Sequence, residues 1–228
     1  MKPKILLSWS SGKDSAWSLH VLRQRGDVEV VGLLTTINTH FQRVAMHGTR
    51  HALLKAQAEA ARLPLWEVPL PWPCSNEVYE QAMSAACASA VQNGVSAIAF
   101  GDLFLEDVRR YREDRLRGTG LDPMFPVWGR NTRELIAEML DGGLRARIVC
   151  ADPSKLPSEF AGCDLTHDLF ERWPAGVDPC GERGEFHTFA YSGPMFHDPI
   201  AIETGETVIR DGFAYSDVLL AESTAGKV

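Results

Sequence analysis

The feature that most constrains the fold is a regular alternation of short apolar runs and longer helical segments through the first two-thirds of the chain. Four mostly apolar runs are typical of buried strands, namely 5–7, 28–34, 65–70 and 95–100. Each is followed by a segment with helical character, namely 16–25, 49–62, 76–92 and 105–117. Repeated strand–helix units of this length predict an α/β fold with a parallel sheet and helices on both faces.

The pattern changes in the last third of the chain. Asn131 and Glu134 form a capping-box-like helix start, and 144–150 and 185–191 alternate like half-buried strands. The segment 200–220 is typical of a hairpin with its turn at Asp211-Gly212. We therefore place a boundary between 125 and 145, near residue 130. A doubly wound domain over 1–130 is expected to precede a smaller α+β lobe over 131–228.

Composition narrows the class of protein. The net charge of the 228 residues is −7, so the surface as a whole is not suited to following a nucleic acid. No apolar run approaches the length of a membrane span, and Met1–Lys4 leads directly into a strand, so we expect neither a membrane segment nor a signal peptide. The five cysteines are odd in number and far apart, with no C-x-x-C pair, which favours the reducing cytoplasm.

The loop between the first strand and its helix, Ser8–Ser15, is the first candidate site. Its sequence is Ser-Trp-Ser-Ser-Gly-Lys-Asp-Ser. Small residues and a lysine at a helix N-terminus suit an anion, because backbone N–H groups and the helix dipole both face it. A Walker A loop is excluded by Leu7 and Asp14, and no G-x-G-x-x-G is present. From this loop alone, an ordinary serine-rich turn remains the alternative.

Further polar residues follow the other predicted strands. Gly101-Asp102 ends the fourth strand, and Thr35 and Asn38 come after the second. In a doubly wound sheet, ligands bind beyond the carboxyl ends of the strands where the strand order reverses. If the first and fourth strands flank that point, Gly101-Asp102 and Ser8–Ser15 share one crevice with Thr35 and Asn38 at its edge. Asp102 suits a metal or hydroxyl partner there, and a helix cap is the alternative.

Two further stretches carry dense polar chemistry. Asp178–Thr188 places two glycines, two glutamates and a histidine in a turn before a strand, which suits a substrate pocket. Cys180 within it is more typical of a buried structural cysteine than of a nucleophile. The segment 105–117 is predicted to be a strongly charged helix with arginines on several faces. The alternative to a functional role is an ordinary solvent-exposed helix stabilised by pairs such as Glu106–Arg110.

Together these stretches resemble one family. Ser10–Ser15, His47-Gly48, 101–113, 125–129 and 178–188 are similar, in order, to motifs of the diphthine–ammonia ligase-like branch of the PP-loop (N-type) ATP pyrophosphatases, which belong to the adenine nucleotide alpha hydrolase-like proteins. Ser11 stands where the S-G-G-x-D-S signature has its first glycine. The resemblance implies a doubly wound, five-stranded parallel sheet of the HUP-like, PP-loop ATPase type over 1–130, which binds ATP. It implies a smaller C-terminal substrate-binding lobe over 131–228.

The resemblance also implies an activity and its residues. A substrate carboxylate attacks the α-phosphorus of ATP, pyrophosphate leaves, and ammonia displaces AMP to give an amide. The implied nucleotide-binding residues are Ser8, Ser10, Ser11, Gly12, Lys13, Asp14, Ser15, Thr35, Asn38 and Gly101. The implied catalytic residues are Lys13, Asp14 and Asp102, with Lys13 and the amides of Ser11–Asp14 stabilising charge on pyrophosphate. The implied substrate-binding residues are Glu106, Arg109, Arg112, Glu182, Glu185, His187 and Thr188.

Charge balance predicts magnesium. ATP carries roughly −4, whereas Lys13 and a helix N-terminus supply about +1.5. Asp14 and Asp102 are the candidate ligands, directly or through water. The expected partners are ATP, ammonia and a small or protein-borne carboxylate; a nucleic acid is not expected, and a homodimer is compatible with the sequence.

The alternatives are a PP-loop enzyme that modifies RNA or a cofactor, such as a tRNA-thiolating type, and a non-ligase adenine-nucleotide-binding or -hydrolysing protein. Enzymes of the thiolating type usually have paired cysteines, which this spacing does not offer.

Overall fold

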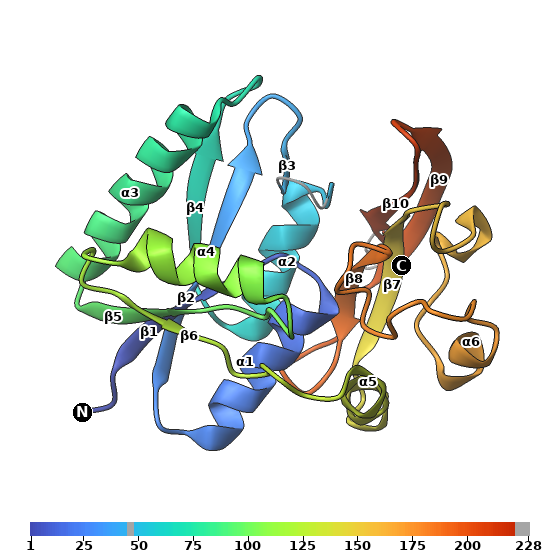
Figure 1. Ribbon diagram of the computed structural model, residues 1–228, viewed down its shortest axis with the longest axis horizontal. Coiled ribbons are helices and arrows are strands. Elements are labelled where there is room, and N and C mark those ends of the chain that lie inside the picture. The colour runs from blue at the N-terminus through green and yellow to red at the C-terminus, as the bar shows by residue number, and fades with distance from the viewer. Residues whose placement is uncertain (45–47, 222–228) are drawn as a thin grey trace, which may run out of the picture.

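The first of two sheets holds five parallel strands. The computed structural model of the chain describes residues 1–44 and 48–221 (Figure 1). The parallel strands are β1 (Lys4–Ser8), β2 (Glu29–Asn38), β4 (Leu65–Leu70), β5 (Val95–Ala99) and β6 (Asp122–Met124). They lie in the order β4-β2-β1-β5-β6, and the short β3 (Arg43–Val44) pairs antiparallel with the end of β2. The strand order thus reverses between β1 and β5, which confirms the expected switch point.

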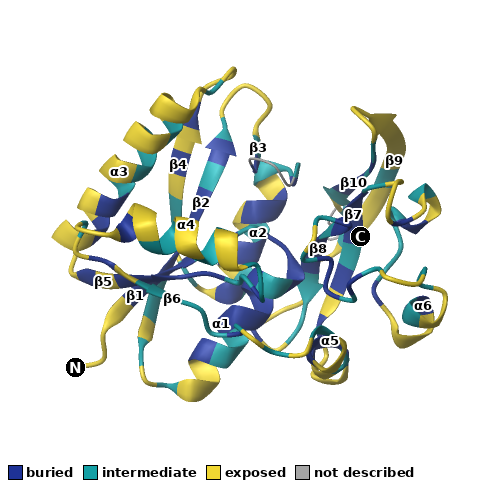
Figure 2. Ribbon diagram, viewed as in Figure 1, coloured by how far each residue is buried: buried dark blue, intermediate teal, exposed yellow. Residues whose placement is uncertain are grey.

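Helices cover both faces of this sheet, as the alternating apolar pattern predicts. Ile5 and Leu7 of β1 pack in a core shared with α1 (Lys13–Arg25) and α2 (His51–Ala61). Leu6 points to the opposite face and packs with α3 (Asn76–Gln92) and α4 (Glu106–Leu116). Figure 2 shows buried residues along the strands and exposed ones on the outer sides of the helices. The doubly wound α/β class is therefore confirmed.

Most predicted elements lie within a few residues of their observed bounds. Two differences concern the site. β2 continues through Asn38, four residues beyond the prediction, because its second half pairs along the whole of β4. Helix α1 begins at Lys13 instead of Ala16, so Lys13 and Asp14 belong to its first turn. The predicted cap at Asn131 is confirmed, since its side chain accepts hydrogen bonds from two amides at the start of α5 (Thr132–Asp141).

The second sheet is antiparallel and confirms a smaller C-terminal lobe. Its strands are β7 (Arg145–Ala151), β8 (Phe186–Ser192), β9 (Ile202–Arg210) and β10 (Phe213–Leu220), in the order β8-β7-β10-β9. The turn between β9 and β10 falls at Asp211-Gly212, as predicted. A short 3-10 helix (Ser158–Phe160) and α6 (His167–Glu171) lie between β7 and β8. The division of the chain at residue 130 into an ATP-binding and a substrate-binding part stays a prediction.

Strand β8 joins the two sheets through the loop that precedes α1. The Ala190 amide donates to the Ser11 carbonyl at 2.9 Å. The buried Gln57 side chain of α2 donates to the same carbonyl at 2.9 Å and to that of Ala190 at 2.6 Å. The candidate loop therefore lies where the two sheets meet. In the described parts of the chain, no helix has the length and apolar character needed to cross a membrane.

Candidate functional site

The loop Ser8–Ser15 adopts an unusual backbone at the position where the related motif has glycine. Ser11 has φ of 70° and is fully buried. Gly12 is the N-cap of α1 and offers no side chain to cap it. An uncapped helix start leaves backbone N–H groups open to an anion, and this arrangement suits the predicted phosphate loop.

Some of these N–H groups already have partners. The Gly12 amide donates to Ser10 Oγ at 3.3 Å, and the Lys13 amide donates to Thr188 Oγ1 at 3.0 Å. Thr188, predicted to bind substrate, therefore contacts the loop itself in this conformation. Two of the four amides expected to face pyrophosphate are occupied by the protein.

Lys13 is buried and faces the second lobe. Its Nζ donates to Asp14 Oδ2 at 2.8 Å and to the Cys180 carbonyl, and lies 5.1 Å from the centre of the Phe186 ring. Burial lowers the pKa of the ammonium, but the neighbouring Asp14, Cys180 and Glu182 outweigh burial, and the pKa is raised. Lys13 is therefore held as a cation between α1 and the turn that contains Cys180.

Asp14 and Glu182 lie near this lysine, and Asp102 lies near Glu182. Burial raises the pKa of Asp14 against the opposing effect of Lys13. Burial also raises the pKa of Asp102, opposed by Arg112, whose Nε lies 3.4 Å from Asp102 Oδ2. For Glu182, burial raises the pKa to about 7, opposed by a hydrogen bond from the Leu103 amide. The helix-cap alternative for Asp102 is wrong, because α4 has its N-cap at Leu105.

The lack of a side chain at Gly101 allows the backbone of Asp14 and Ser15 to pack closely against it. A Cβ at this position would lie 3.0 Å from the carbonyl carbon of Asp14 and 3.0 Å from the Ser15 nitrogen. Real Cβ atoms essentially never come closer, so even alanine would push β5 and α1 apart. The backbone that approaches Gly101 is that of Asp14 and Ser15. The binding of a nucleotide at Gly101 stays a prediction.

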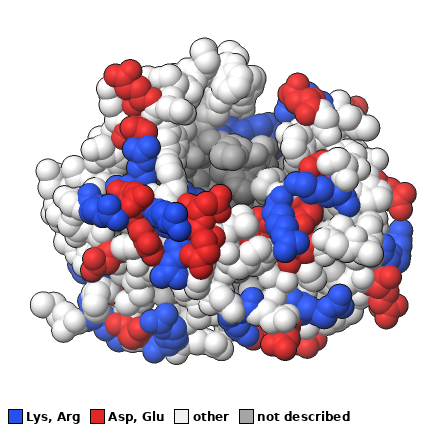
Figure 3. All heavy atoms as spheres, in the orientation of Figure 1, with Lys and Arg blue, Asp and Glu red and all other residues white. Residues whose placement is uncertain are grey.

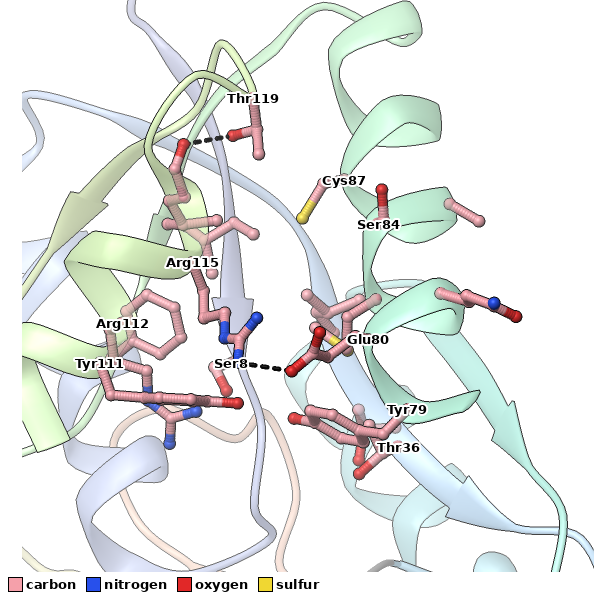
Figure 4. A pocket seen from close by; sticks show the side chains of 18 of the residues that line it. Ser8, Thr36, Tyr79, Glu80, Ser84, Cys87, Tyr111, Arg112, Arg115 and Thr119 are labelled. Atoms are coloured by element: carbon pink, nitrogen blue, oxygen red, sulfur yellow. Dashed lines mark hydrogen bonds and ion pairs between the residues drawn. The ribbon is translucent and has the colours of Figure 1, made fainter. Parts of the chain in front are cut away.

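A cavity of about 800 Å³ opens beside the loop, between α3 and α4 (Figure 4). Of the predicted residues, it is lined by Ser8, Ser10, Thr35 and Arg112. Its walls are mostly apolar, from Leu34, Val44, Met83, Cys87, Ile98, Phe100 and Leu116. A volume within the usual range of ligand pockets and apolar walls with a few polar groups suit a nucleoside.

The residues around the opening of this cavity were not predicted from the sequence. Arg115 of α4 and Glu80 of α3 form an ion pair at 2.5 Å across it, and Tyr79 and Tyr111 lie beside them in Figure 4. A signal did exist in α3, where Tyr79, Met83 and Cys87 recur every four residues and so share one helix face. The sequence suggested only close packing for this helix.

Several predicted residues lie elsewhere or serve the protein itself. Asn38 Oδ1 accepts from the amides of residues 40 and 41 and stabilises the turn after β2. The Arg109 guanidinium lies 4.9 Å from the Phe125 and Trp128 ring centres, and Glu106 is exposed at the start of α4.

The predicted residues of the 178–188 turn also differ in role. Glu185 accepts from the Asp178 and Arg183 amides and so closes the turn. Burial and the nearby Lys13 lower the pKa of His187 to about 4, so it is neutral near pH 7. His47 of the predicted His47-Gly48 motif lies outside the described residues. As expected, Cys180 is buried and its thiol pKa is raised by burial.

Three buried polar atoms near the loop are available to hydrogen-bond a ligand. Among residues 1–44 and 48–221, Ser11 Oγ, Asp14 Oδ1 and Thr35 Oγ1 are buried and have no hydrogen-bond partner. Buried polar atoms without partners are rare in folded proteins, so two such atoms in the loop and one on the adjacent β2 point to a ligand. In the same residues, no group of three or more His, Cys, Asp or Glu side chains is arranged to hold a metal ion.

Comparison with known proteins gives matches to two family models and to curated relatives. Residues 1–123 match the family model of the diphthamide synthase N-terminal domain, and residues 131–219 match that of its C-terminal domain. A diphthine–ammonia ligase of Danio rerio is 33% identical over 132 residues, covering 54% of this chain and 51% of that protein.

Two mammalian proteins of the same name match over a longer stretch. The diphthine–ammonia ligases of Rattus norvegicus and Homo sapiens are each 26% identical, over 184 and 186 residues, covering 74% of this chain and 68% of the relative. The two domain models match in the order in which the two sheets follow each other along the chain. This chain therefore belongs to the diphthamide synthase family.

Proposed function

We propose that this protein is an ATP-dependent ligase that joins ammonia to a substrate carboxylate and releases AMP and pyrophosphate. One observation carries the proposal: the loop Ser8–Ser15 belongs to two sites at once. Ser8 and Ser10 line the 800 Å³ cavity, while Lys13 and Asp14 lie in the charged cluster shared with the second lobe. Such a loop suits an enzyme that holds a nucleotide on one side and an acyl group on the other.

The proposed chemistry has two steps. A carboxylate oxygen attacks the α-phosphorus, and the bond from that phosphorus to the bridging oxygen of pyrophosphate breaks. Ammonia then attacks the acyl carbon, AMP leaves with the electron pair of its bond, and the nitrogen loses a proton. Lys13 would stabilise the charge that grows on pyrophosphate. Glu182, whose pKa burial raises to about 7, suits the role of proton acceptor.

Magnesium fits the residues at the loop. Mg²⁺ usually takes one or two carboxylates together with substrate phosphates and water. Asp14 Oδ1 is buried without a partner among the described residues, and burial raises the pKa of both Asp14 and Asp102. A nearby cation would favour the ionised form of both groups. When bound, the metal would neutralise phosphate charge.

The acyl substrate is a carboxylate-bearing molecule, and diphthine, which the relatives' names contain, is the first candidate. A tRNA-thiolating activity has little support, because the sequence has no C-x-x-C pair and Cys180 is buried with a raised pKa. Free cysteines also support the expected cytoplasmic location. The homodimer stays a prediction, to be checked by light scattering.

The proposal is tested with α-labelled ATP, magnesium, ammonium and a peptide carrying diphthine, with nucleotides separated by thin-layer chromatography. We expect AMP whose formation requires the acyl substrate, and a loss of activity when EDTA removes magnesium. Lys13→Met is expected to lower the rate by about 100-fold or more, because it removes a charge that stabilises the transition state. Lys55→Met, at an exposed position on α2, is the matched control.

Two results would contradict the proposal. ADP as the product would show cleavage at a different phosphate. ATP binding by calorimetry without AMP formation would favour the alternative of a nucleotide-binding protein.

A further inference from the structure

A second cavity lies outside the site described above. It has a volume of about 240 Å³ and lies between the start of α2, β3 and the strands β9 and β10. These elements are labelled in Figure 1, and Figure 3 shows that basic and acidic side chains are interspersed over this face of the molecule. Its polar lining consists of Arg43, Thr49, Arg50, Glu206, Arg210, Tyr215, Ser216 and Asp217. None of these residues has a role in the proposed ligase reaction.

The start of α2 at this cavity is electrostatically unusual. This eleven-residue helix has Arg50 as its N-cap, with no side-chain hydrogen bond from the cap and no acidic residue in its first turn. Backbone carbonyls accept from some of its first amides, for example Gln42 from the His51 amide at 3.0 Å. Helix N-termini carry partial positive charge and normally attract a carboxylate or a capping oxygen. A helix start with an arginine therefore leaves an unmet preference for negative charge.

A buried hydroxyl in the same lining supports an anion independently. Thr49 is 5% exposed, and its Oγ1 has no hydrogen-bond partner within residues 1–44 and 48–221. A buried hydroxyl without a partner destabilises the folded protein. An acceptor in the cavity beside Thr49 would remove this destabilisation.

The arginines are held in place and keep an excess of positive charge. Asp217 accepts from Arg50 Nε at 3.1 Å and from Arg43 at 3.2 Å. With Arg210 and Glu206, the lining has three arginines and two carboxylates, a net charge of +1. Asp217 thus fixes the two guanidinium groups without neutralising the site, and a guanidinium has five N–H donors to share.

We propose that this cavity is a binding site for a small oxyanion, a phosphate group or a carboxylate. The Thr49 hydroxyl and the arginines are hydrogen-bond donors, and the arginines and the N-terminus of α2 carry positive charge. The volume is several times that of one water molecule and suits a single anionic group. The site adjoins the nucleotide cavity, since Val44 lines the first cavity and its neighbour Arg43 lines the second.

The proposal is tested by calorimetric titration of inorganic phosphate into the full chain. Thr49→Val is expected to weaken phosphate binding about fivefold, because the variant loses one neutral hydrogen bond to the anion. Arg50→Gln is expected to weaken it at least about tenfold, because a charge-assisted hydrogen bond is lost. Arg25→Gln, which removes an exposed arginine paired with Asp27, should leave binding unchanged. Thr49→Val nearly preserves shape and remains informative if Arg50→Gln folds poorly.

Two further titrations identify the ion and the place. Succinate that competes with phosphate would show that the site takes carboxylates, and failure to compete would show preference for phosphate; both support the proposal. Thr35 lines the first cavity and not the second. Thr35→Val should therefore leave the affinity for phosphate at the second cavity unchanged.

Absence of phosphate and succinate binding by the unaltered protein would overturn the proposal. So would binding that Thr35→Val abolishes while Thr49→Val and Arg50→Gln leave it intact. Neither result depends on ATP turnover, so the ligase proposal stands or falls separately.

Discussion

At the scale of single residues, Ser11 shows how this chain departs from the motif it resembles. Its φ of 70° lies in the left-handed region, where a side chain costs roughly 1–2 kcal/mol and glycine costs little. Its hydroxyl is buried and has no partner among the described residues. The glycine of the related motif would meet both conditions without strain. Serine at this position is tolerated because β8 and Gln57 hold the Ser11 carbonyl.

Ser11→Gly is therefore expected to stabilise the protein by about 1 kcal/mol, since relief of backbone strain exceeds the added entropy of the unfolded chain. Urea unfolding would measure the change. Ser11→Ala is the control, because it removes the hydroxyl and retains the strained backbone. An equal gain from both variants would assign the effect to the hydroxyl and contradict the backbone explanation.

The raised pKa of Glu182 predicts that the stability of the protein depends on pH. Its folded pKa of about 7 exceeds its ordinary value of 4.5. Between these values the folded state binds the proton more tightly, so the contribution of Glu182 to stability decreases as pH rises through this window. Glu182→Gln, which keeps an acceptor for the Leu103 amide, should remove that decrease. The melting temperature of the variant relative to the natural protein should rise between about pH 5 and about pH 8.

A constant difference between the two melting temperatures across this range would contradict the raised pKa of Glu182. The comparison is internal, so other groups that titrate in both proteins cancel.

At the scale of elements, the position of α1 against β5 depends on a missing side chain. The backbone of Asp14 and Ser15 approaches Gly101 so closely that a Cβ would lie 3.0 Å from it. The close approach brings the residues that follow β5 next to the start of α1, and Asp102 lies near Glu182. The geometry of the charged cluster is therefore set by how closely one strand and one helix pack.

Gly101→Ala is expected to destabilise the protein by about 2 kcal/mol, because the contact is with backbone atoms that cannot rotate away. ATP binding should weaken as well, since α1 and its loop must shift. Thermal unfolding and calorimetry with ATP would measure both effects. Ser96→Ala on the same strand is exposed and serves as control. An unchanged affinity for ATP would separate this packing contact from the nucleotide site.

At the scale of the whole molecule, one buried glutamine links the two sheets. Gln57 is fully buried, accepts from Trp9 Nε1 at 2.8 Å, and donates to the carbonyls of Ser11 and Ala190. The main core cluster also contains residues of both sheets, such as Leu7 and Ile148. We therefore expect the two sheets to unfold together.

Gln57→Leu is expected to cost about 3 kcal/mol, because it leaves a buried N–H and two carbonyls with fewer partners. Urea unfolding followed by tryptophan fluorescence and by circular dichroism should give one coincident transition for the natural protein. Gln24→Leu, at an exposed position of α1, should change stability little. Two separate transitions in the natural protein would show that the sheets are independent domains.

Local pattern was enough to predict most of the elements and the class of the fold. The strand at Leu65–Leu70, the helix Asn76–Gln92 and the hairpin at Asp211-Gly212 agree with the prediction, because hydrophobic period, caps and turn residues act over a few neighbours. The bound of β2 was predicted too short, because its last residues are strand-like through pairing with β4.

The sequence by itself therefore determined the alternation of strands and helices, the chemistry of the loop at Ser8–Ser15, and the resemblance to one family. Only the tertiary structure decided what that loop contacts. The pairing of Lys13 with the Cys180 carbonyl joins residues 167 positions apart, and the cavity between α3 and α4 exists only once both helices lie on one sheet face. Contacts of this kind depend on long-range packing of complementary surfaces, which spacing along a chain does not encode locally.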